Sequence, residues 1–223
     1  MLQTGPLVKS LYADAGSGVV FNLSGQLTIG GETIPEGVIV LPAQTKAETI
    51  ALAPNSQIAG IRFHPAIGFG LLGKHYEKPT ILQENQIQPY DFYRINSKLL
   101  SLKDNSERVD ALLEWAREQF DIVDVIPDDM ECALDSIRQG DVISKLSEKT
   151  KVSQRHIERH FKHWLGMTPK HYQRILRIKK AVGYLRQHRG ANLAEVAHTF
   201  GFSDQAHMTR EFRTIARLTP KQV

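Results

Sequence analysis

The last third of the chain carries nearly the same sequence pattern twice, and this doubling constrains the fold more than any other feature. The stretches 143–172 and 193–223 share apolar, capping and basic residues, displaced by 50 residues at first and by 51 later. The matching pairs are Ile143 and Leu193, Leu146 and Val196, Val152 and Phe202, Ser153 and Ser203, Ile157 and Met208, Phe161 and Phe212, Thr168 and Thr219, and Pro169 and Pro220. The chain therefore contains two copies of a small helical unit.

Each copy is predicted to hold two short helices. In the first copy, Asp141 is expected to cap a helix that begins near Val142, because an aspartate oxygen can accept hydrogen bonds from the free N–H groups of a first turn. Ser153 is expected to cap the second helix. The apolar residues of that helix recur every four positions and mark its buried stripe: Ile157, Phe161 and Leu165.

The second copy repeats this arrangement. Asn192 stands at the cap position and Glu195 follows three residues later, which is a variant of the capping box. Ser147 and Ala197 occupy matching positions, and their small side chains allow two helices to approach closely. Two short helices joined by a turn form a helix-turn-helix, so the chain is predicted to contain two of them.

The exposed face of each second helix is predicted to be polar and largely cationic. Its residues are Arg155, Glu158, Arg159 and Lys162 in the first copy, and Ala206, Thr209, Arg210 and Arg213 in the second. Such a stripe on a well-packed helix suits base edges near the helix N-terminus and phosphates farther along. An ordinary solvated helix face is the alternative, and the doubling argues against it.

Donor and acceptor geometry indicates roles for these side chains. Arg159 and Arg210 are each expected to donate to guanine O6 and N7, a contact that discriminates against other bases by about 1–3 kcal/mol. Gln205 suits adenine, and Glu158 can accept from cytosine N4. The full set expected to read bases is Arg155, Glu158, Arg159, Gln205, Ala206, Thr209 and Arg210. The set expected to contact phosphate is Lys162, Lys170, Lys179 and Arg213.

Charge is distributed unevenly along the chain. Residues 1–132 hold 10 Lys and Arg against 17 Asp and Glu, a formal net charge of −7, whereas residues 133–223 hold 18 against 7, a net charge of +11. Only the C-terminal part is suited to a polyanion, because clustered cations displace counterions from phosphate chains. No apolar run approaches the roughly 20 residues that a membrane helix needs, so we expect a soluble cytoplasmic protein without membrane partners.

The N-terminal part is predicted to be β-rich. Apolar runs at 19–21, 38–40 and 61–63 alternate with turn formers, as in an antiparallel sheet, barrel or sandwich. The segment is short for a closed barrel, so the sheet is expected to be partial, truncated or completed by a partner. From about Tyr90 the apolar period becomes helical: Leu99, Leu100, Leu102, Val109, Leu112, Leu113, Ala116 and Phe120. The second domain is placed from Pro127.

The stretch GFSDQAHMTREFR at 201–213, followed by Leu218-Thr219-Pro220, resembles the signature of the AraC/XylS family of transcription regulators. The resemblance covers about residues 130–223. It implies two helix-turn-helix units joined by a long helix at 169–187, with reading helices in successive major grooves on one DNA face. The basic residues on that joining helix are Lys170, Arg174, Arg177, Lys179 and Lys180. The turn of the first copy contains Lys151 at the position where the second copy has Gly201. This lysine departs from the family pattern.

Two signals favour other chemistry. His156 and His160 are four residues apart on one helix, but Glu158 does not directly follow the first histidine as in zinc proteases, so a phosphate or packing role is favoured over a metal. Cys132 cannot form an internal disulfide, because it is the only cysteine. A cysteine-dependent DNA alkyl acceptor using the same DNA-binding module is the alternative function, whereas a buried structural cysteine is favoured.

The sequence therefore predicts an α+β protein. Residues 1–126 form a small β-rich domain with a helical extension, and residues 127–223 form an all-α domain of two helix-turn-helix units. The family resemblance implies a cupin-like sheet in the first domain, for sensing a small molecule or for dimerisation. The expected function is sequence-specific transcription regulation without catalysis, cofactor or metal. The expected partners are double-stranded promoter DNA, a small-molecule effector, RNA polymerase and a second copy of the chain.

Overall fold

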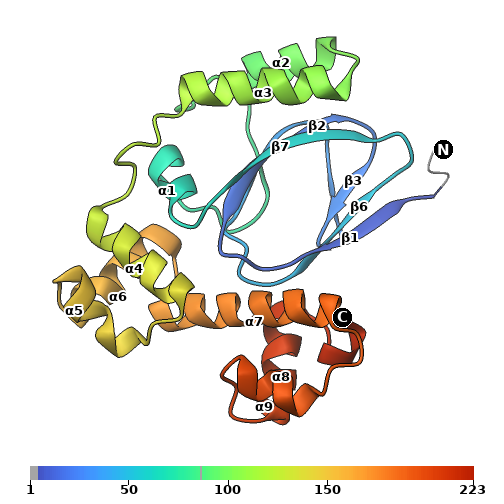
Figure 1. Cartoon of the computed structure of the whole chain (residues 1–223). Coiled ribbons are helices and arrows are strands. Elements are labelled where there is room, and N and C mark those ends of the chain that lie inside the picture. The colour runs from blue at the N-terminus through green and yellow to red at the C-terminus, as the bar shows by residue number, and fades with distance from the viewer. Residues whose placement is uncertain (1–4, 86) are drawn as a thin grey trace. The chain divides into compact units, whose positions relative to one another are not determined.

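The computed structural model describes residues 5–85 and 87–223, which divide into two compact units (Figure 1). The β-rich unit comprises residues 5–11, Gly16–Ala43 and Glu48–Val125 without residue 86. The helical unit comprises Ile126–Val223 together with the short segments Tyr12–Ala15 and Gln44–Ala47. Among the described residues, no helix is both long and apolar enough to cross a membrane.

The β-rich unit contains two four-stranded antiparallel sheets, with strand orders β1-β6-β3-β4 and β7-β2-β5-β8. The strands are β1 Leu7–Leu11, β2 Ser17–Ser24, β3 Leu27–Ile29, β4 Glu32–Ile34, β5 Gly37–Leu41, β6 Glu48–Leu52, β7 Gln57–Phe63 and β8 Thr80–Ile81. The three apolar runs predicted as strands lie in β2, β5 and β7, which confirms the β-rich assignment.

The sheet β7-β2-β5-β8 is covered on both faces, which explains the unbroken apolar runs of its central strands. Side chains alternate between the faces along each strand. On one face, Ile39 packs with Leu27 and Ile34 of the other sheet. On the opposite face, Phe21 and Val38 pack with apolar residues of the helices that follow. The residues of that helical layer are Phe92, Ile95, Leu99, Leu112 and Trp115.

These helices are α1 Ile67–Leu72, α2 Phe92–Ser101 and α3 Asn105–Gln119. The helix predicted from the apolar spacing is confirmed as α3, and two of those apolar residues, Val109 and Leu113, are 56% and 47% exposed. The buried residues of α3 are Arg108, Ala111, Leu112 and Trp115. The large indole of Trp115 offers more apolar area to the sheet, so the helix turns this side inward.

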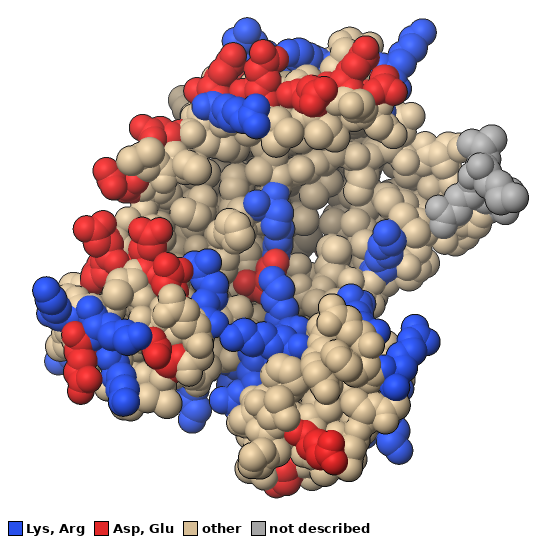
Figure 2. Space-filling view, viewed as in Figure 1, with Lys and Arg blue, Asp and Glu red and all other residues tan. Residues whose placement is uncertain are grey.

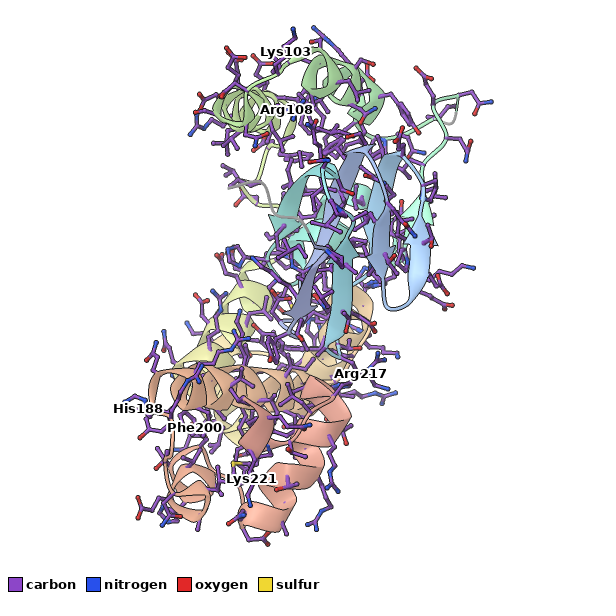
Figure 3. All side chains as sticks on the ribbon, turned by 90° about the vertical axis from the view of Figure 1, so that its right-hand side faces the viewer. Lys103, Arg108, His188, Phe200, Arg217 and Lys221 are labelled. Atoms are coloured by element: carbon purple, nitrogen blue, oxygen red, sulfur yellow. The ribbon has the colours of Figure 1, made fainter. Side chains whose placement is uncertain are left out.

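Arg108 is a buried charge that the periodicity of α3 did not reveal (Figure 3). Its guanidinium donates hydrogen bonds to the carbonyls of Leu99 and Leu102, at 2.7–3.1 Å, and to Asn105 Oδ1 at 3.2 Å. The last carbonyls of a helix have no partner within the helix. Arg108 therefore closes the C-terminal end of α2 and fixes the connection to α3.

The helical unit follows the predicted doubled pattern. Its elements are α4 Asp128–Gln139, a 3-10 turn Ile143–Lys145, α5 Leu146–Thr150, α6 Gln154–Leu165, α7 Pro169–Gln187, α8 Leu193–Thr199, α9 Gln205–Glu211, a π-helical turn Phe212–Ala216 and a 3-10 turn Pro220–Gln222. The joining helix α7 has the predicted bounds, with Thr168 as N-cap and Pro169 in the first turn. Helices α5 and α6 form the first copy, and α8 and α9 form the second.

The N-caps of the two second helices show how the copies correspond. Ser153 accepts a hydrogen bond from His156 N, and Asp204 accepts one from His207 N. The true partner of Ser153 is therefore Asp204 and not Ser203, which corrects that predicted pair. Ser203 instead contacts the ring of His207, with Oγ 3.1 Å from Nδ1. The extra residue of the second copy thus lies before its reading helix.

The turns of both copies use the left-handed backbone region. Lys151 has φ 57°, and Gly201, its partner at a displacement of 50, has φ 72°. Lys151 therefore departs from the family pattern in residue type, but the backbone conformation of the turn is the same in both copies. A lysine is strained in this region, whereas glycine is not.

The predicted N-cap is confirmed in the second copy and wrong in the first. Asn192 caps α8, because its Oδ1 accepts from Ala194 N at 2.9 Å. Asp141 was expected to cap the first helix, and this is wrong, since Val142 occupies the cap position without a side-chain bond. The Asp141 carboxylate instead forms an ion pair with Lys149. An ammonium competes well for a carboxylate that would otherwise accept backbone N–H bonds.

Candidate nucleic-acid interface

The apolar stripe of each reading helix is buried as predicted. In α6, Ile157 and Phe161 are 4% and 0% exposed, and in the second copy Met208 and Phe212 are both fully buried. Each stripe anchors its helix in the core of the helical unit. The opposite faces of α6 and α9 are consequently held outward by packing, which is the arrangement that groove recognition requires.

The outward face of α6 carries the four predicted residues Arg155, Glu158, Arg159 and Lys162, all exposed. Several already have partners within the helix. Gln154 donates to Glu158 Oε1 at 3.1 Å, and Lys162 Nζ donates to the carbonyl of Gly166 at 3.2 Å. Arg159 Nη2 lies 3.0 Å from His156 Nδ1. A DNA contact by Arg159 or Lys162 would therefore replace an existing hydrogen bond.

The outward face of α9 is shorter and less charged. Gln205, Ala206 and Arg210 are exposed, and Thr209 is half-buried with its hydroxyl donating to the carbonyl of Gln205 at 2.9 Å. Arg213 is exposed but lies in the π-helical turn that follows α9. A π-helical turn rotates each residue by less than an α-helix does. Arg213 therefore does not continue the α-helical stripe that the spacing predicted.

The basic residues of α7 divide into two groups. Lys170 and Lys179, both predicted to contact phosphate, are exposed. Three others make contacts inside the helical unit: Arg174 pairs with Glu211, Arg177 lies 5.4 Å from the ring centroid of Phe202, and Lys180 donates to the carbonyl of Arg138 at 2.8 Å. These three side chains hold neighbouring elements against the joining helix.

The pair Arg174–Glu211 joins α7 to the end of α9. Arg174 Nε and Nη2 donate to the two carboxylate oxygens at 2.7 and 2.8 Å, and the Glu211 side chain is only 12% exposed. Hydrogen bonding from Arg174 holds the pKa of Glu211 below its ordinary value. Such a bidentate pair fixes orientation as well as distance. Sequence reasoning placed Arg174 on a surface face and missed this pair, whose members are 37 residues apart.

Glu211→Gln is expected to lower the free energy of unfolding of the helical unit by about 1–2 kcal/mol at pH 7. Hydrogen bonds to charged groups contribute roughly 1.5–3 kcal/mol, and the one-third exposure of Arg174 weakens the pair. Because the folded-state pKa of Glu211 is depressed, its contribution is present above the unfolded pKa and is lost as pH falls through the folded pKa. Urea unfolding at pH 7 and at pH 3 measures both effects.

The variant should therefore lose less stability than the parent on acidification. Glu148→Gln is the matched control, since Glu148 is an exposed acid of α5 in the same unit. Equal acid-induced losses in Glu211→Gln and the parent would contradict the assigned role of the pair.

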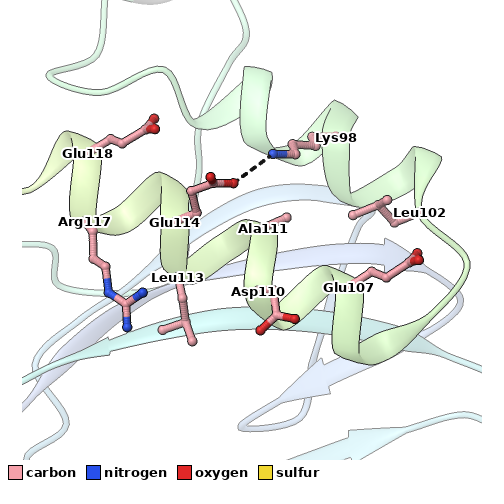
Figure 4. A pocket seen from close by; sticks show the side chains of 9 residues that line it. All are labelled: Lys98, Leu102, Glu107, Asp110, Ala111, Leu113, Glu114, Arg117 and Glu118. Atoms are coloured by element: carbon pink, nitrogen blue, oxygen red, sulfur yellow. Dashed lines mark hydrogen bonds and ion pairs between the residues drawn. The ribbon is translucent and has the colours of Figure 1, made fainter.

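Charge on the surface follows the division of the chain. Figure 2 shows Lys and Arg gathered over the helical unit, while Asp and Glu gather along α3. The acidic helix α3 borders a pocket of about 770 Å³ beside the end of α2 (Figure 4). Its charged lining residues are Lys98, Glu107, Asp110, Glu114, Arg117 and Glu118. The excess of carboxylates favours a cationic occupant over an anionic one.

Cys132 lies half-buried on α4, with its Sγ 3.9 Å from the carbonyl of Lys149. A reactive cysteine needs a base or cationic surroundings that stabilise its thiolate. The carbonyl oxygen of Lys149 is neither a base nor a cation, so this contact does not support the alkyl-acceptor alternative.

Two helix-turn-helix units with outward basic helices define a DNA-binding helix-turn-helix protein. Residues 146–223 match the family model described as a helix-turn-helix domain. The chain is also similar to the HTH-type transcriptional activator RhaS of Escherichia coli O9:H4 (strain HS), with 28% identity over 123 residues. This alignment covers 55% of the chain and 38% of RhaS, so the chain matches less than half of that relative's length.

Two solved structures are similar to the chain. One is a transcriptional regulator from Chromobacterium violaceum described by its AraC-type DNA-binding domain, with 24% identity, a TM-score of 0.40, and coverage of 42% of this chain and 87% of that one. The other is ToxT from Vibrio cholerae bound to an unsaturated fatty acid, with 9% identity, a TM-score of 0.46, and coverage of 100% and 95%. Within its helical unit, the chain therefore contains a helix-turn-helix domain and is similar to an HTH-type transcriptional activator.

Proposed function

We propose that the protein regulates transcription by reading two successive major-groove segments, one with α6 and one with α9. The observation that carries this proposal is that both helices present exposed polar and cationic faces from one helical unit and are linked by the single helix α7. In this proposal the protein binds DNA and performs no catalysis. The base-reading and phosphate-contacting residues keep the roles predicted from the sequence.

The length of α7 fits this role. Its 19 residues span about 28 Å at 1.5 Å per residue. One turn of DNA measures about 34 Å, so a helix of this length can place two reading helices about one turn apart. Both copies would then face the same side of the duplex.

The two reading faces differ, and this bears on the kind of site they recognise. Arg155 and Glu158 of α6 correspond to Ala206 and Thr209 of α9, whereas the arginine at 159 and 210 is common to both, as is the glutamine at 154 and 205. A guanine in each half-site would suit this shared arginine. One chain would therefore read two unlike half-sites in direct order, without a palindrome.

The proposal extends to further partners. The β-rich unit would receive a small-molecule effector or mediate dimerisation, and RNA polymerase would be contacted at the promoter. The pocket beside α3 is a candidate place for such an effector. A ligand that acts as an effector should change the DNA affinity of the full chain, as measured by fluorescence anisotropy.

Arg210→Ala and Lys179→Ala are expected to weaken DNA binding in different ways. Loss of Arg210 should reduce affinity for the specific site by roughly 5- to 150-fold, equivalent to about 1–3 kcal/mol, and relax the base preference at one position. Loss of Lys179 should weaken binding to all sequences alike and reduce the salt dependence by about one phosphate contact. Fluorescence anisotropy with selected and random duplexes, over a series of salt concentrations, separates the two.

Lys103→Ala is the control, because Lys103 is an exposed cation of the β-rich unit. Equal losses on specific and random DNA for Arg210→Ala would defeat the base-reading role. If in vitro selection with the parent protein enriched no sequence over random DNA, the proposed function itself would fail.

A further inference from the structure

Three potential metal ligands converge where the first turn of α4 meets α6. Asp129 Oδ2 lies 3.2 Å from His156 Nε2 and 3.2 Å from His160 Nδ1. The two imidazole rings, one helical turn apart on α6, have centroids 3.9 Å apart. One ligand atom from each of the three residues lies within 4.8 Å of the other two. The sequence indicated only the histidine pair, because Asp129 is far away in the chain.

The two separations of 3.2 Å between Asp129 and the histidines match the edges of a small coordination polyhedron. A tetrahedral zinc ion has bonds of about 2.0–2.2 Å to histidine nitrogens and carboxylate oxygens, which places its ligand atoms about 3.3 Å apart. Two histidines at i and i+4 on one helix can bind one metal ion together. Asp129 supplies the third ligand from a different helix, α4. In this the cluster differs from the site of zinc proteases, whose third ligand is another residue.

A simple ion pair accounts for the cluster less well. His160 Nδ1 is buried and makes no hydrogen bond, although it lies 3.2 Å from Asp129 Oδ2. A buried nitrogen without a partner is costly, and a metal bond would satisfy it.

We propose that Asp129, His156 and His160 bind one divalent transition-metal ion, with zinc as the best fit to two imidazoles and a carboxylate. The three side chains are 20–31% exposed, so solvent reaches the cluster and can supply a fourth ligand. The ion ties α4 to α6 and thereby restrains the first reading helix. Metal binding is thus a further property of the protein in this proposal, and it does not require DNA.

Metal binding would also change the environment of Arg159. Arg159 Nη2 lies 3.0 Å from His156 Nδ1, a contact that requires an unprotonated Nδ1 as acceptor. With a metal ion on Nε2, the neutral ring carries its proton on Nδ1, and the contact would join two donors. The guanidinium of Arg159 is then released toward solvent. This consequence rests on the proposed function, since Arg159 is one of the expected base-reading residues.

The test uses the full chain with any affinity tag removed. Co²⁺ serves as the spectroscopic probe, and Zn²⁺ is titrated in competition with a chromophoric chelator. We expect one ion per chain, visible absorption bands of four-coordinate Co²⁺, and displacement of Co²⁺ by Zn²⁺. Saturating Zn²⁺ should also raise the unfolding temperature, because the ion binds the folded state. Absence of stoichiometric binding to the parent protein would overturn the proposal without any variant.

His160→Ala and Asp129→Ala are each expected to weaken Zn²⁺ binding more than about 100-fold, since loss of residues behind the ligands alone costs about 10–100-fold. His198→Ala, at an exposed histidine of α8, should bind as the parent does. Circular dichroism verifies that each variant is folded. Unchanged affinity in both folded ligand variants would overturn the assignment. Because no DNA is present, failure here leaves the regulatory function standing, and failure to bind DNA leaves the metal site standing.

Discussion

Phe212→Ala is expected to lower the free energy of unfolding of the helical unit by about 3–5 kcal/mol, which is the usual cost of truncating a buried phenylalanine. Phe212 is fully buried at the start of the π-helical turn that follows α9. Its loss leaves a cavity beneath the second reading helix. Urea unfolding measures the effect, and Phe161→Ala should cost a similar amount, because Phe161 is the fully buried counterpart in the first copy.

Phe200→Ala is the matched control for this prediction. Phe200 follows α8 and is only partly buried, with its ring 5.5 Å from that of Tyr184 (Figure 3). Its truncation should cost clearly less, because less apolar area leaves water when it packs. If Phe200→Ala and Phe212→Ala were equally destabilising, burial beneath the reading helix would not explain the effect.

The doubled pattern predicted the helical unit well because local signals and tertiary packing agree there. Thr168 and Pro169 mark the start of α7 through capping and ring geometry, both of which depend on neighbouring residues alone. The apolar stripe of α6 follows from the helical period in the same way. The runs in β2 and β5 were equally recognisable, since these central strands are covered on two faces and their runs are therefore continuously apolar.

The sequence failed where a role depends on a distant partner. Nothing near Glu211 shows that Arg174 will reach it, and nothing near His160 shows that Asp129 will lie beside it. Charged residues on a helix surface look alike whether they face solvent or a neighbouring helix. Arg174 was for this reason grouped with the other basic residues of α7, and the cluster of Asp129, His156 and His160 was recognised only as a histidine pair.

The same limit applies to α3. Val109 and Leu113 have the spacing of a buried stripe, yet the helix turns Trp115 and Arg108 inward. Periodicity identifies an amphipathic helix, but a helix with apolar residues on more than one face has no unique inward direction. The carbonyls at the end of α2, which have no partner within that helix, determine which face of α3 turns inward, because Arg108 donates hydrogen bonds to them.

Insertion of five base pairs between the two half-sites is expected to reduce affinity for the operator by at least about 100-fold, toward the level of non-specific binding. The insertion rotates one half-site by about half a turn of the duplex. The protein cannot follow, because α7 is one continuous helix. Its contacts through Arg174 and Lys180 further fix the elements at its sides. Anisotropy titrations at one salt concentration, with an operator from in vitro selection, measure the loss.

A ten-base-pair insertion distinguishes a rigid joining helix from a flexible one. It returns the second half-site to the same face of the DNA but moves it about 34 Å farther away, beyond the reach of a 19-residue helix. We therefore expect no recovery of affinity, whereas a flexible connection would regain part of it. A substitution that scrambles one half-site is the control, and it should lower affinity as much as either insertion. Full binding to the five-base-pair insertion would show that α6 and α9 do not read the DNA as a fixed pair.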